Sequence, residues 1–227
     1  NCSMSFKTDA FVLRSRTWYG ADRIYDLFTP HEGVINAVLK SAAKSKSKLA
    51  GHLLPFAKVR IMIGRGRMDH LAGVSIIKDF SEVRNSLRNL SLASSLAELF
   101  LNEGVQSNKQ EEFILFENVL SYLDDVQVTE EQKLLLVRIF LWKYLSISGW
   151  HPKFDQGIMY ISPGNRGQTV SSELYDFLQF VIKADWTDFA DLSINQRLNK
   201  EWLKISQVYY QTIYDRPSQA LKLLAYG

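Results

Sequence analysis

The chain has few of the residues that form cross-links, metal centres or membrane spans. One of its 227 residues is a cysteine, Cys2, so an intrachain disulfide and a cysteine-based zinc cluster are both excluded. The longest apolar stretch, Leu134 to Ile147, is interrupted by Arg138 and Lys143 and is too short to cross a bilayer. The hydrophobic fraction of 46% still suffices for an ordinary packed core, which predicts a globular protein that makes no membrane contact.

Catalytic motifs are equally scarce. The 4 histidines are scattered, and no two of them have the spacing of metal ligands on one helix or strand. The sequence contains no P-loop, no nucleophile elbow and no HExxH motif. The acidic pairs at 124–125 and 130–131 flank helices, where carboxylates are ordinary solvated charges. We therefore expect no enzyme and no cofactor.

Positive charge is concentrated in the first third of the chain. Residues 1–80 carry 13 Lys and Arg against 6 Asp and Glu, whereas residues 81–227 carry 14 against 18. A basic first part joined to a mildly acidic remainder predicts two modules, with any polyanion contact on the first.

The first module has the alternation of β-strands, with frequent turns. We expect strands near residues 11–16, 23–28, 34–40, 59–63 and 68–80, and short strands without a long helix favour a small closed barrel. In the first strand, Phe11 and Leu13 alternate with Val12, Arg14 and Arg16, which predicts a half-buried strand with a basic outer face.

Two loops of this module are rich in cations. Residues 40–48 combine 4 lysines with small side chains and no acid, and Gly64-Arg65-Gly66-Arg67 forms a basic turn. Such loops suit a polyanion whose phosphates can be met without base-specific geometry, although a lysine-rich loop is often only a solvated connector. Most aromatic residues lie at helical spacing and belong to the core; Trp18 and Tyr19, beside the basic strand, are exceptions.

From about Ser81 the hydrophobic spacing becomes helical. We expect helices around residues 87–100, 113–123 and 133–148, then an irregular segment or short ribbon over 150–172, then two or three helices up to Leu224. Thr129 and Gln132 have the spacing of a capping box, and Gly149 should end the helix that follows.

Arg138 stands out because the helix around it is apolar on nearly every side. A buried guanidinium requires an anion. The partner could be internal, such as Glu98 or Asp124, or it could be the carboxylate of another chain that enters a groove above Arg138.

Several segments resemble the RecO family of bacterial recombination mediators. In the first module these are Asp9-Ala-Phe-Val-Leu-Arg-Ser-Arg, Ala21-Asp-Arg-Ile, Leu54-Pro-Phe, Gly64-Arg-Gly and Leu71-Ala-Gly-Val. Arg138-Ile-Phe, Leu145, Gly149-Trp-His-Pro and, more loosely, Arg216-Pro-Ser continue the resemblance in the helical part.

The resemblance implies an α+β fold, with an OB-fold β-barrel over residues 1–80 that binds DNA and an all-α helical domain over 81–227. It implies a non-enzymatic mediator that binds single- and double-stranded DNA, anneals strands and, with RecR, helps to load RecA in the bacterial cytoplasm, at the nucleoid. The helical domain would bind the acidic, hydrophobic C-terminal tail of single-stranded-DNA-binding protein. Many relatives hold zinc with four cysteines after the Gly-aromatic-x-Pro element; residues 153–167 have none, so we expect a zinc-free variant.

The resemblance and the charge pattern together define two candidate sites. The predicted DNA-binding residues are Arg14, Arg16, Lys40, Lys44, Lys46, Lys48, Arg60, Arg65 and Arg67, and the predicted tail-binding residues are Arg138, Leu145 and Trp142. Two alternatives remain open: an RNA- or ribosome-associated barrel protein, and a protein-interaction scaffold whose basic loop is incidental.

Overall fold

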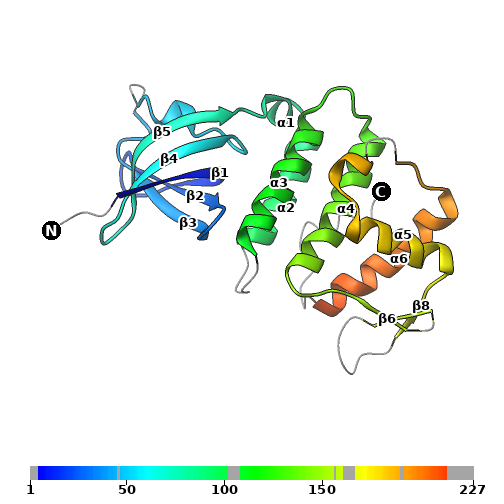
Figure 1. The fold of residues 1–227 in the computed structure, drawn as a ribbon. Coiled ribbons are helices and arrows are strands. Elements are labelled where there is room, and N and C mark those ends of the chain that lie inside the picture. The colour runs from blue at the N-terminus through cyan, green and yellow to red at the C-terminus, as the bar shows by residue number, and fades with distance from the viewer. Residues whose placement is uncertain are drawn as a thin grey trace. The chain divides into compact units, whose positions relative to one another are not determined.

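The computed structural model describes residues 5–44, 47–101, 108–155, 157–160, 167–189 and 192–213. The chain forms two compact units, one of Asn1–Glu103 with Lys109–Asp125 and one of Gly104–Asn108 with Val126–Gly227. Each unit is described by itself below, with the element labels of Figure 1.

The first unit contains a closed barrel of five strands in the order β1-β2-β3-β5-β4. The strands are β1 (Ser5–Thr17), β2 (Arg23–Thr29), β3 (Gly33–Leu39), β4 (Lys58–Gly64) and β5 (His70–Lys78) (Figure 1). All pairs are antiparallel except β3 with β5, which meet through a parallel bridge between Val38 and His70. This connectivity is that of the OB-fold, so the predicted barrel is confirmed.

Strand β1 pairs with two neighbouring strands because it bends at a bulge between Val12 and Arg14. Its first half pairs with β4 and its second half with β2, so both ends of β1 lie at the same end of the barrel. The expected alternation along β1 was wrong near the bulge. Val12 faces the barrel core, whereas Phe11 packs against the rings of Phe113 and Phe116.

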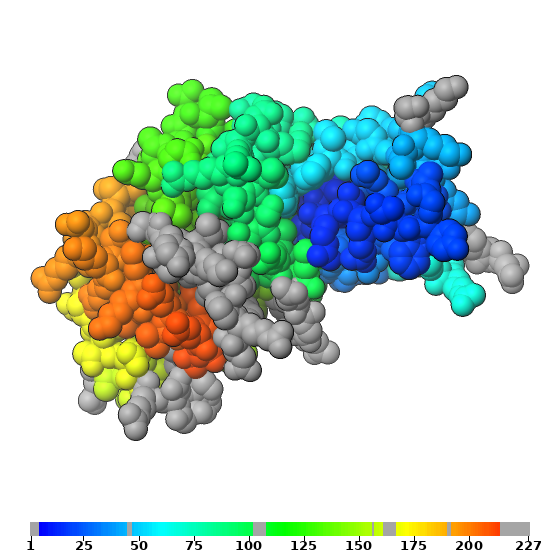
Figure 2. Space-filling model, turned by 180° about the vertical axis from the view of Figure 1, so that it is seen from behind, coloured from blue at the N-terminus to red at the C-terminus, as the bar shows by residue number. Residues whose placement is uncertain are grey.

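Three helices close one end of the barrel: α1 (Ser81–Asn85), α2 (Leu87–Leu101) and α3 (Lys109–Asp124). An aromatic cluster joins them to the strands, with Phe28 stacked on Phe100 at 4.3 Å between ring centroids. In the space-filling view the strands and these helices of the first unit lie in direct contact (Figure 2). The last strand of the barrel ends at Lys78, while the compact unit continues through α3.

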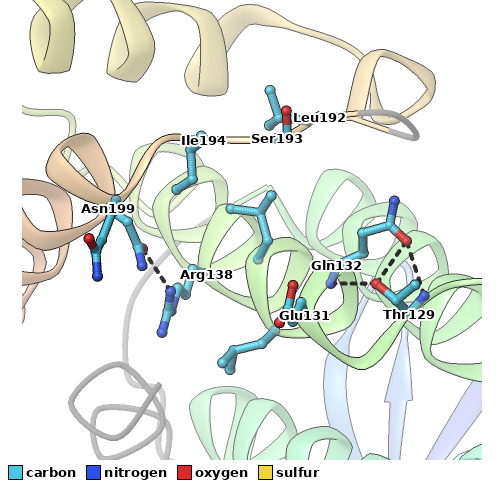
Figure 3. A pocket seen from close by; sticks show the side chains of 11 residues that line it. Thr129, Glu131, Gln132, Arg138, Leu192, Ser193, Ile194 and Asn199 are labelled. Carbon is cyan, nitrogen blue, oxygen red and sulfur yellow. Dashed lines mark hydrogen bonds between the residues drawn. The ribbon is translucent and has the colours of Figure 1, made fainter.

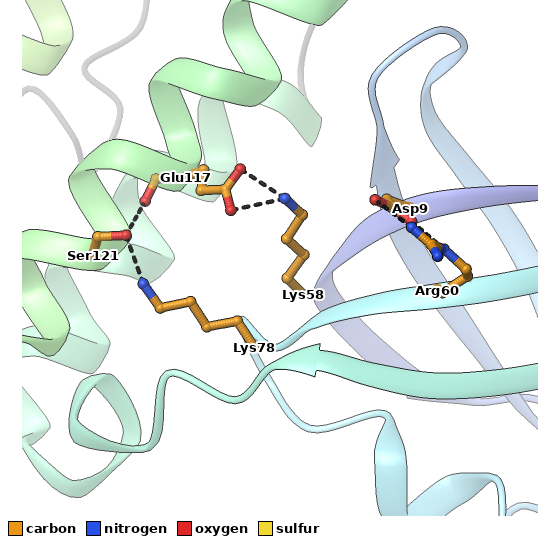
Figure 4. A network of polar contacts seen from close by, with 6 residues as sticks. All are labelled: Asp9, Lys58, Arg60, Lys78, Glu117 and Ser121. Atoms are coloured by element: carbon orange, nitrogen blue, oxygen red, sulfur yellow. Dashed lines mark hydrogen bonds and ion pairs between the residues drawn. The ribbon is translucent and has the colours of Figure 1, made fainter.

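Two lysines at the same end tie the strands to α3 (Figure 4). The Lys58 ammonium donates to both carboxylate oxygens of Glu117 at 2.8 Å, and Lys78 donates to the Ser121 hydroxyl at 2.9 Å. Figure 4 also shows the Asp9–Arg60 pair on neighbouring strands β1 and β4. These cations therefore have structural partners within the first unit.

The second unit is mainly helical. It consists of α4 (Glu130–Ile147), α5 (Ser172–Lys183), α6 (Gln196–Ile213), the 3₁₀ turn η2 (Trp186–Phe189) and a small sheet of β6 (Lys153–Asp155), β7 (Ile158–Tyr160) and β8 (Gln168–Thr169). The sheet confirms the predicted ribbon. Residues 214–224, where a last helix was expected, lie outside the described residues.

Helix α4 begins and ends as its sequence predicts. The Thr129 hydroxyl accepts from the Gln132 amide while the Gln132 side chain accepts from the Thr129 amide, which completes the capping box. The helix ends before Gly149, whose φ of +88° suits a glycine. A barrel followed by helices confirms the α+β fold class.

Candidate nucleic-acid interface and buried arginine pocket

The strand register gathers three loops at the barrel end opposite the helices, here called the distal end. They are residues 18–22, which join β1 to β2, the start of the 40–57 loop after β3, and residues 65–69, which join β4 to β5. Thr17 pairs with Arg23, and Arg23 pairs with Leu39. The bridge from Val38 to His70 brings the last loop beside the second. In OB-folds the β1–β2 and β4–β5 loops are ones that bind oligonucleotides.

The lysine-rich loop is anchored on both sides. At its start the Ser41 amide donates to Asp22 Oδ1 at 2.7 Å, and the Ala43 amide donates to the Ala21 carbonyl at 2.9 Å. At its end Leu53, just after the short helix η1 (Ala50–His52), is buried in the barrel core. The bonds at Ser41 and Ala43 therefore hold the described start of this loop, with Lys40 and Lys44, at the distal end.

Four of the nine predicted DNA-binding residues are cations exposed in these loops: Lys40, Lys44, Lys48 and Arg67. In the part of the chain that the structure describes, no carboxylate pairs with any of them. Lys46 lies outside the described residues.

Arg14 and Arg16 lie on the outer face of β1 and share a single acid. Asp26 on β2 is buried, and its Oδ2 accepts from Arg14 Nε at 2.8 Å, while Arg16 Nη2 lies 3.3 Å from Oδ1. Asn36 on β3 donates to the same carboxylate at 2.6 Å. Both arginine side chains remain about half exposed, at 52% and 45%. Because two arginines share one aspartate, the cluster of Arg14, Arg16 and Asp26 carries one net positive charge.

Arg60 and Arg65 are locally neutralised. Arg60 pairs with Asp9 at 2.8 Å, and Arg65 pairs with Glu32 and Asp69, each at 2.5 Å. The hydrogen bonds that Arg60 donates to Asp9 and that Arg65 donates to Glu32 raise the pKa of each guanidinium. The predicted residues that the structure describes are therefore not equivalent: four loop cations have no carboxylate partner among the described residues, whereas Arg65 and the three strand arginines are paired.

The second unit contains a cavity of about 770 Å³ between α4, the segment before α6 and α6 itself (Figure 3). Arg138 and Asn199 lie at one part of it and the Thr129 cap at another. Its apolar lining comes from Leu134, Leu135, Leu192 and Ile194.

Arg138 is 5% exposed and incompletely paired. Its Nη1 donates to Asn199 Oδ1 at 3.0 Å, but its Nε and Nη2 atoms have no hydrogen-bond partner among the described residues. Asp124, one of the internal partners considered for it, accepts from the amides at the start of α1 in the first unit. Burial lowers the pKa of the Arg138 guanidinium, which still remains protonated at physiological pH.

The structure places Trp142 and Leu145 differently from Arg138. Both are fully buried, and neither lines the cavity. The Trp142 indole donates to Ser206 Oγ at 2.9 Å and stacks on Tyr209 at 4.6 Å. The apolar lining that sequence reasoning missed, Leu134 and Leu135, precedes Arg138 by four and three residues. That spacing, which puts side chains on one helix face, was the available signal.

Other kinds of site have little support in the described ranges. No group of three or more His, Cys, Asp or Glu side chains there could hold a metal ion. No helix among the residues described is long and apolar enough to cross a membrane.

A five-stranded OB-type barrel followed by helices is an architecture found among proteins that bind nucleic acids. Residues 4–80 match the family model described as Recombination protein O N terminal, and residues 84–159 match Recombination protein O C terminal. The chain belongs to the RecO family of DNA repair proteins.

Curated relatives agree with this assignment. A DNA repair protein RecO from Dehalococcoides mccartyi is 32% identical over 152 residues, covering 66% of this chain and 59% of that protein. One from another strain is 28% identical over 219 residues, covering 86% of this chain and 85% of the relative. The Clostridium perfringens protein is 24% identical over 237 residues and covers 95% of each chain.

Proposed function

We propose that this protein is a DNA-repair mediator that binds DNA at the distal end of its barrel, without catalytic turnover. The observation that carries the proposal is the set of exposed cations with no carboxylate partner in the described ranges, Lys40, Lys44, Lys48 and Arg67. Each such cation can neutralise a phosphate and release a counterion, whereas a cation in an internal ion pair must first give up its carboxylate.

Among the residues described, the distal end consists of strand ends, loops and one short 3₁₀ turn, with no long helix that could read bases in a major groove. Phosphate contacts from flexible lysines position a nucleic acid without specifying its sequence. Sequence-independent binding suits a mediator that acts on whatever strand is damaged, and it suits annealing of complementary strands.

The test is a salt titration of DNA binding. The triple variant Lys40→Ala, Lys44→Ala, Lys48→Ala should bind several DNA sequences more weakly to a similar degree. The slope of log affinity against log salt should flatten by about 2–3 units. A matched control removes the same charge elsewhere: Arg197, Lys200 and Lys204 are exposed cations on α6, and their replacement by alanine should leave the slope unchanged.

A competition experiment and the same salt titration separate the alternatives. An RNA- or ribosome-associated barrel would prefer structured RNA over DNA in direct competition. A scaffold with an incidental basic loop would bind nucleic acid weakly, with little dependence on salt. An unchanged slope in the lysine variant would contradict the proposed interface.

We further propose that the Arg138 pocket receives the C-terminal tail of single-stranded-DNA-binding protein. A terminal carboxylate satisfies the two donors of Arg138 that have no acceptor among the described residues. Leu134, Leu135 and Ile194 give the neighbouring tail side chain an apolar wall. An acidic-hydrophobic peptide with a free C-terminus should bind, and the same peptide with an amidated C-terminus should bind at least about 10-fold more weakly. Equal binding of the two peptides would exclude the pocket as a carboxylate site.

We infer that this tail contact brings the protein to single-stranded DNA that is coated with single-stranded-DNA-binding protein, in the bacterial cytoplasm, at the nucleoid. There it would act together with RecR to help load RecA onto the DNA. The family assignment supports these roles. Pull-down of RecR by the wild-type protein, with and without single-stranded DNA, tests them directly.

A further inference from the structure

The turn between β1 and β2 carries two large aromatic side chains that are exposed in the described structure. Trp18 is 50% exposed and Tyr19 is 85% exposed. Neither ring stacks on another ring among the described residues. Exposed aromatic surface is unfavourable in water, and a short turn has no structural need of two such residues.

The turn itself is well ordered by its backbone. The Trp18 amide donates to the Asp22 carbonyl at 3.0 Å, and the Asp22 amide donates back to the Tyr19 carbonyl at 3.0 Å. Gly20 adopts a φ of +58°, which a glycine tolerates without strain. The two rings are therefore held on a closed turn rather than on a loose loop.

The same turn is bonded to the lysine-rich loop. Asp22 accepts from the Ser41 amide and Ala21 accepts from the Ala43 amide, so Trp18 and Tyr19 share the distal end with Lys40 and Lys44. Cations that follow a backbone, next to aromatic faces, are the combination by which proteins hold single strands.

We propose that Trp18 and Tyr19 are a stacking platform for unpaired bases, which gives the distal end a preference for single-stranded over double-stranded DNA. In a duplex the base faces are already stacked on one another, so only the phosphates reach the protein. In a single strand the bases can leave the stack and lie on the two rings, while Lys40 and Lys44 hold the phosphates. This inference rests on the proposed DNA-binding function and adds the strand preference.

The experiment compares a pyrimidine oligonucleotide with a hairpin duplex over a series of salt concentrations. The double variant Trp18→Leu, Tyr19→Leu should lose about 10- to 100-fold in affinity for the single strand. Its affinity for the duplex should change less than about twofold, and its salt slope should stay that of the wild type, because no cation is removed.

Two controls make the result specific. Trp18→Phe with Tyr19→Phe keeps the aromatic faces without the indole NH or the phenol hydroxyl, and should retain most of the single-strand affinity. Leu87→Ala removes an apolar side chain that is 83% exposed on α2, at the helical end of the same unit, and should change nothing. An equal loss for single strand and duplex, or no loss for either, would overturn the platform while leaving the lysine interface standing. Failure of the wild type to bind any DNA would overturn both proposals.

Discussion

The two proposed binding regions present positive charge in opposite ways. At the distal end of the barrel, cations are exposed and have no carboxylate partner in the described ranges. In the second unit, one guanidinium is 5% exposed and keeps two donors without acceptors. Exposed cations gain by releasing counterions, so their binding is salt-sensitive and tolerant of sequence. A buried guanidinium requires a planar acceptor in one orientation, so its binding is selective and less sensitive to salt.

The largest effect that tests this contrast concerns Arg138. Arg138→Ala should weaken binding of the acidic-hydrophobic tail peptide by about 10- to 150-fold, because a charge-assisted contact in a partly desolvated pocket contributes about 1.5–3 kcal/mol. Arg138→Lys should recover only part of this, since an ammonium cannot make the two-pronged contact. Fluorescence polarisation of a labelled peptide measures both.

A stability measurement separates binding from folding at the same residue. Two buried donors of Arg138 have no acceptor in the described structure, so Arg138→Met should keep or raise the melting temperature. A large drop in melting temperature, or normal peptide binding by the alanine variant, would make Arg138 a structural residue.

The next effect tests the difference between paired and unpaired cations within the barrel, where Asp26 is ion-paired with Arg14 and Arg16. Asp26→Asn should lower the free energy of unfolding by about 1–3 kcal/mol, because a buried acceptor for charged donors loses its charge. If the two arginines reach phosphates, the salt slope of DNA binding should steepen by about 1 unit, since one competing negative charge is gone. Denaturant unfolding and a salt titration provide the two readings. A reduced stability with an unchanged slope would remove Arg14 and Arg16 from the DNA interface.

Lys58 is the counterpart of Arg138 in the first unit, a largely buried cation that already has its carboxylate (Figure 4). Lys58→Met should lower the free energy of unfolding by about 1–2 kcal/mol, because Glu117 loses both of its hydrogen bonds. DNA affinity should not change. Lys78→Met is the matched control, since Lys78 donates to a neutral hydroxyl, and it should cost about 0.5 kcal/mol. Equal costs would mean that the Lys58–Glu117 pair contributes nothing beyond a single neutral hydrogen bond.

The smallest expected effect is that of a metal chelator. Packing and hydrogen bonds hold the segment around β6 and β7: the Tyr209 hydroxyl donates to the Trp150 carbonyl, and Phe154 lies edge-on to Tyr175 at 5.1 Å. Chelator treatment should leave the melting temperature unmoved. Stoichiometric zinc in the purified protein would contradict this prediction.

Local patterns in the sequence predicted much of the fold. The alternation of Val59, Ile61 and Ile63 fixes which face of β4 enters the core, and these residues are buried there. The Thr129 capping box forms because its partners are three residues apart. The prediction failed at Val12, which alternation assigns to the outer face but which enters the barrel core beside the bulge. Phe11 is buried as expected, but under helices from later in the chain rather than inside the barrel.

The candidate sites, like the fold, were predictable from the sequence only in part. Clustering of lysines in one short loop is a property of the sequence by itself, and so is the presence of an arginine in an apolar helix. Only the tertiary structure decided which cations are free. Asp26 reaches Arg14 and Arg16 through strand pairing, Asp9 reaches Arg60 across 51 residues, and Asn199 reaches Arg138 across 61. Short-range periodicity follows from backbone geometry, but a charge is neutralised by whatever the packed chain brings within about 4 Å of it, and sequence order does not encode that distance.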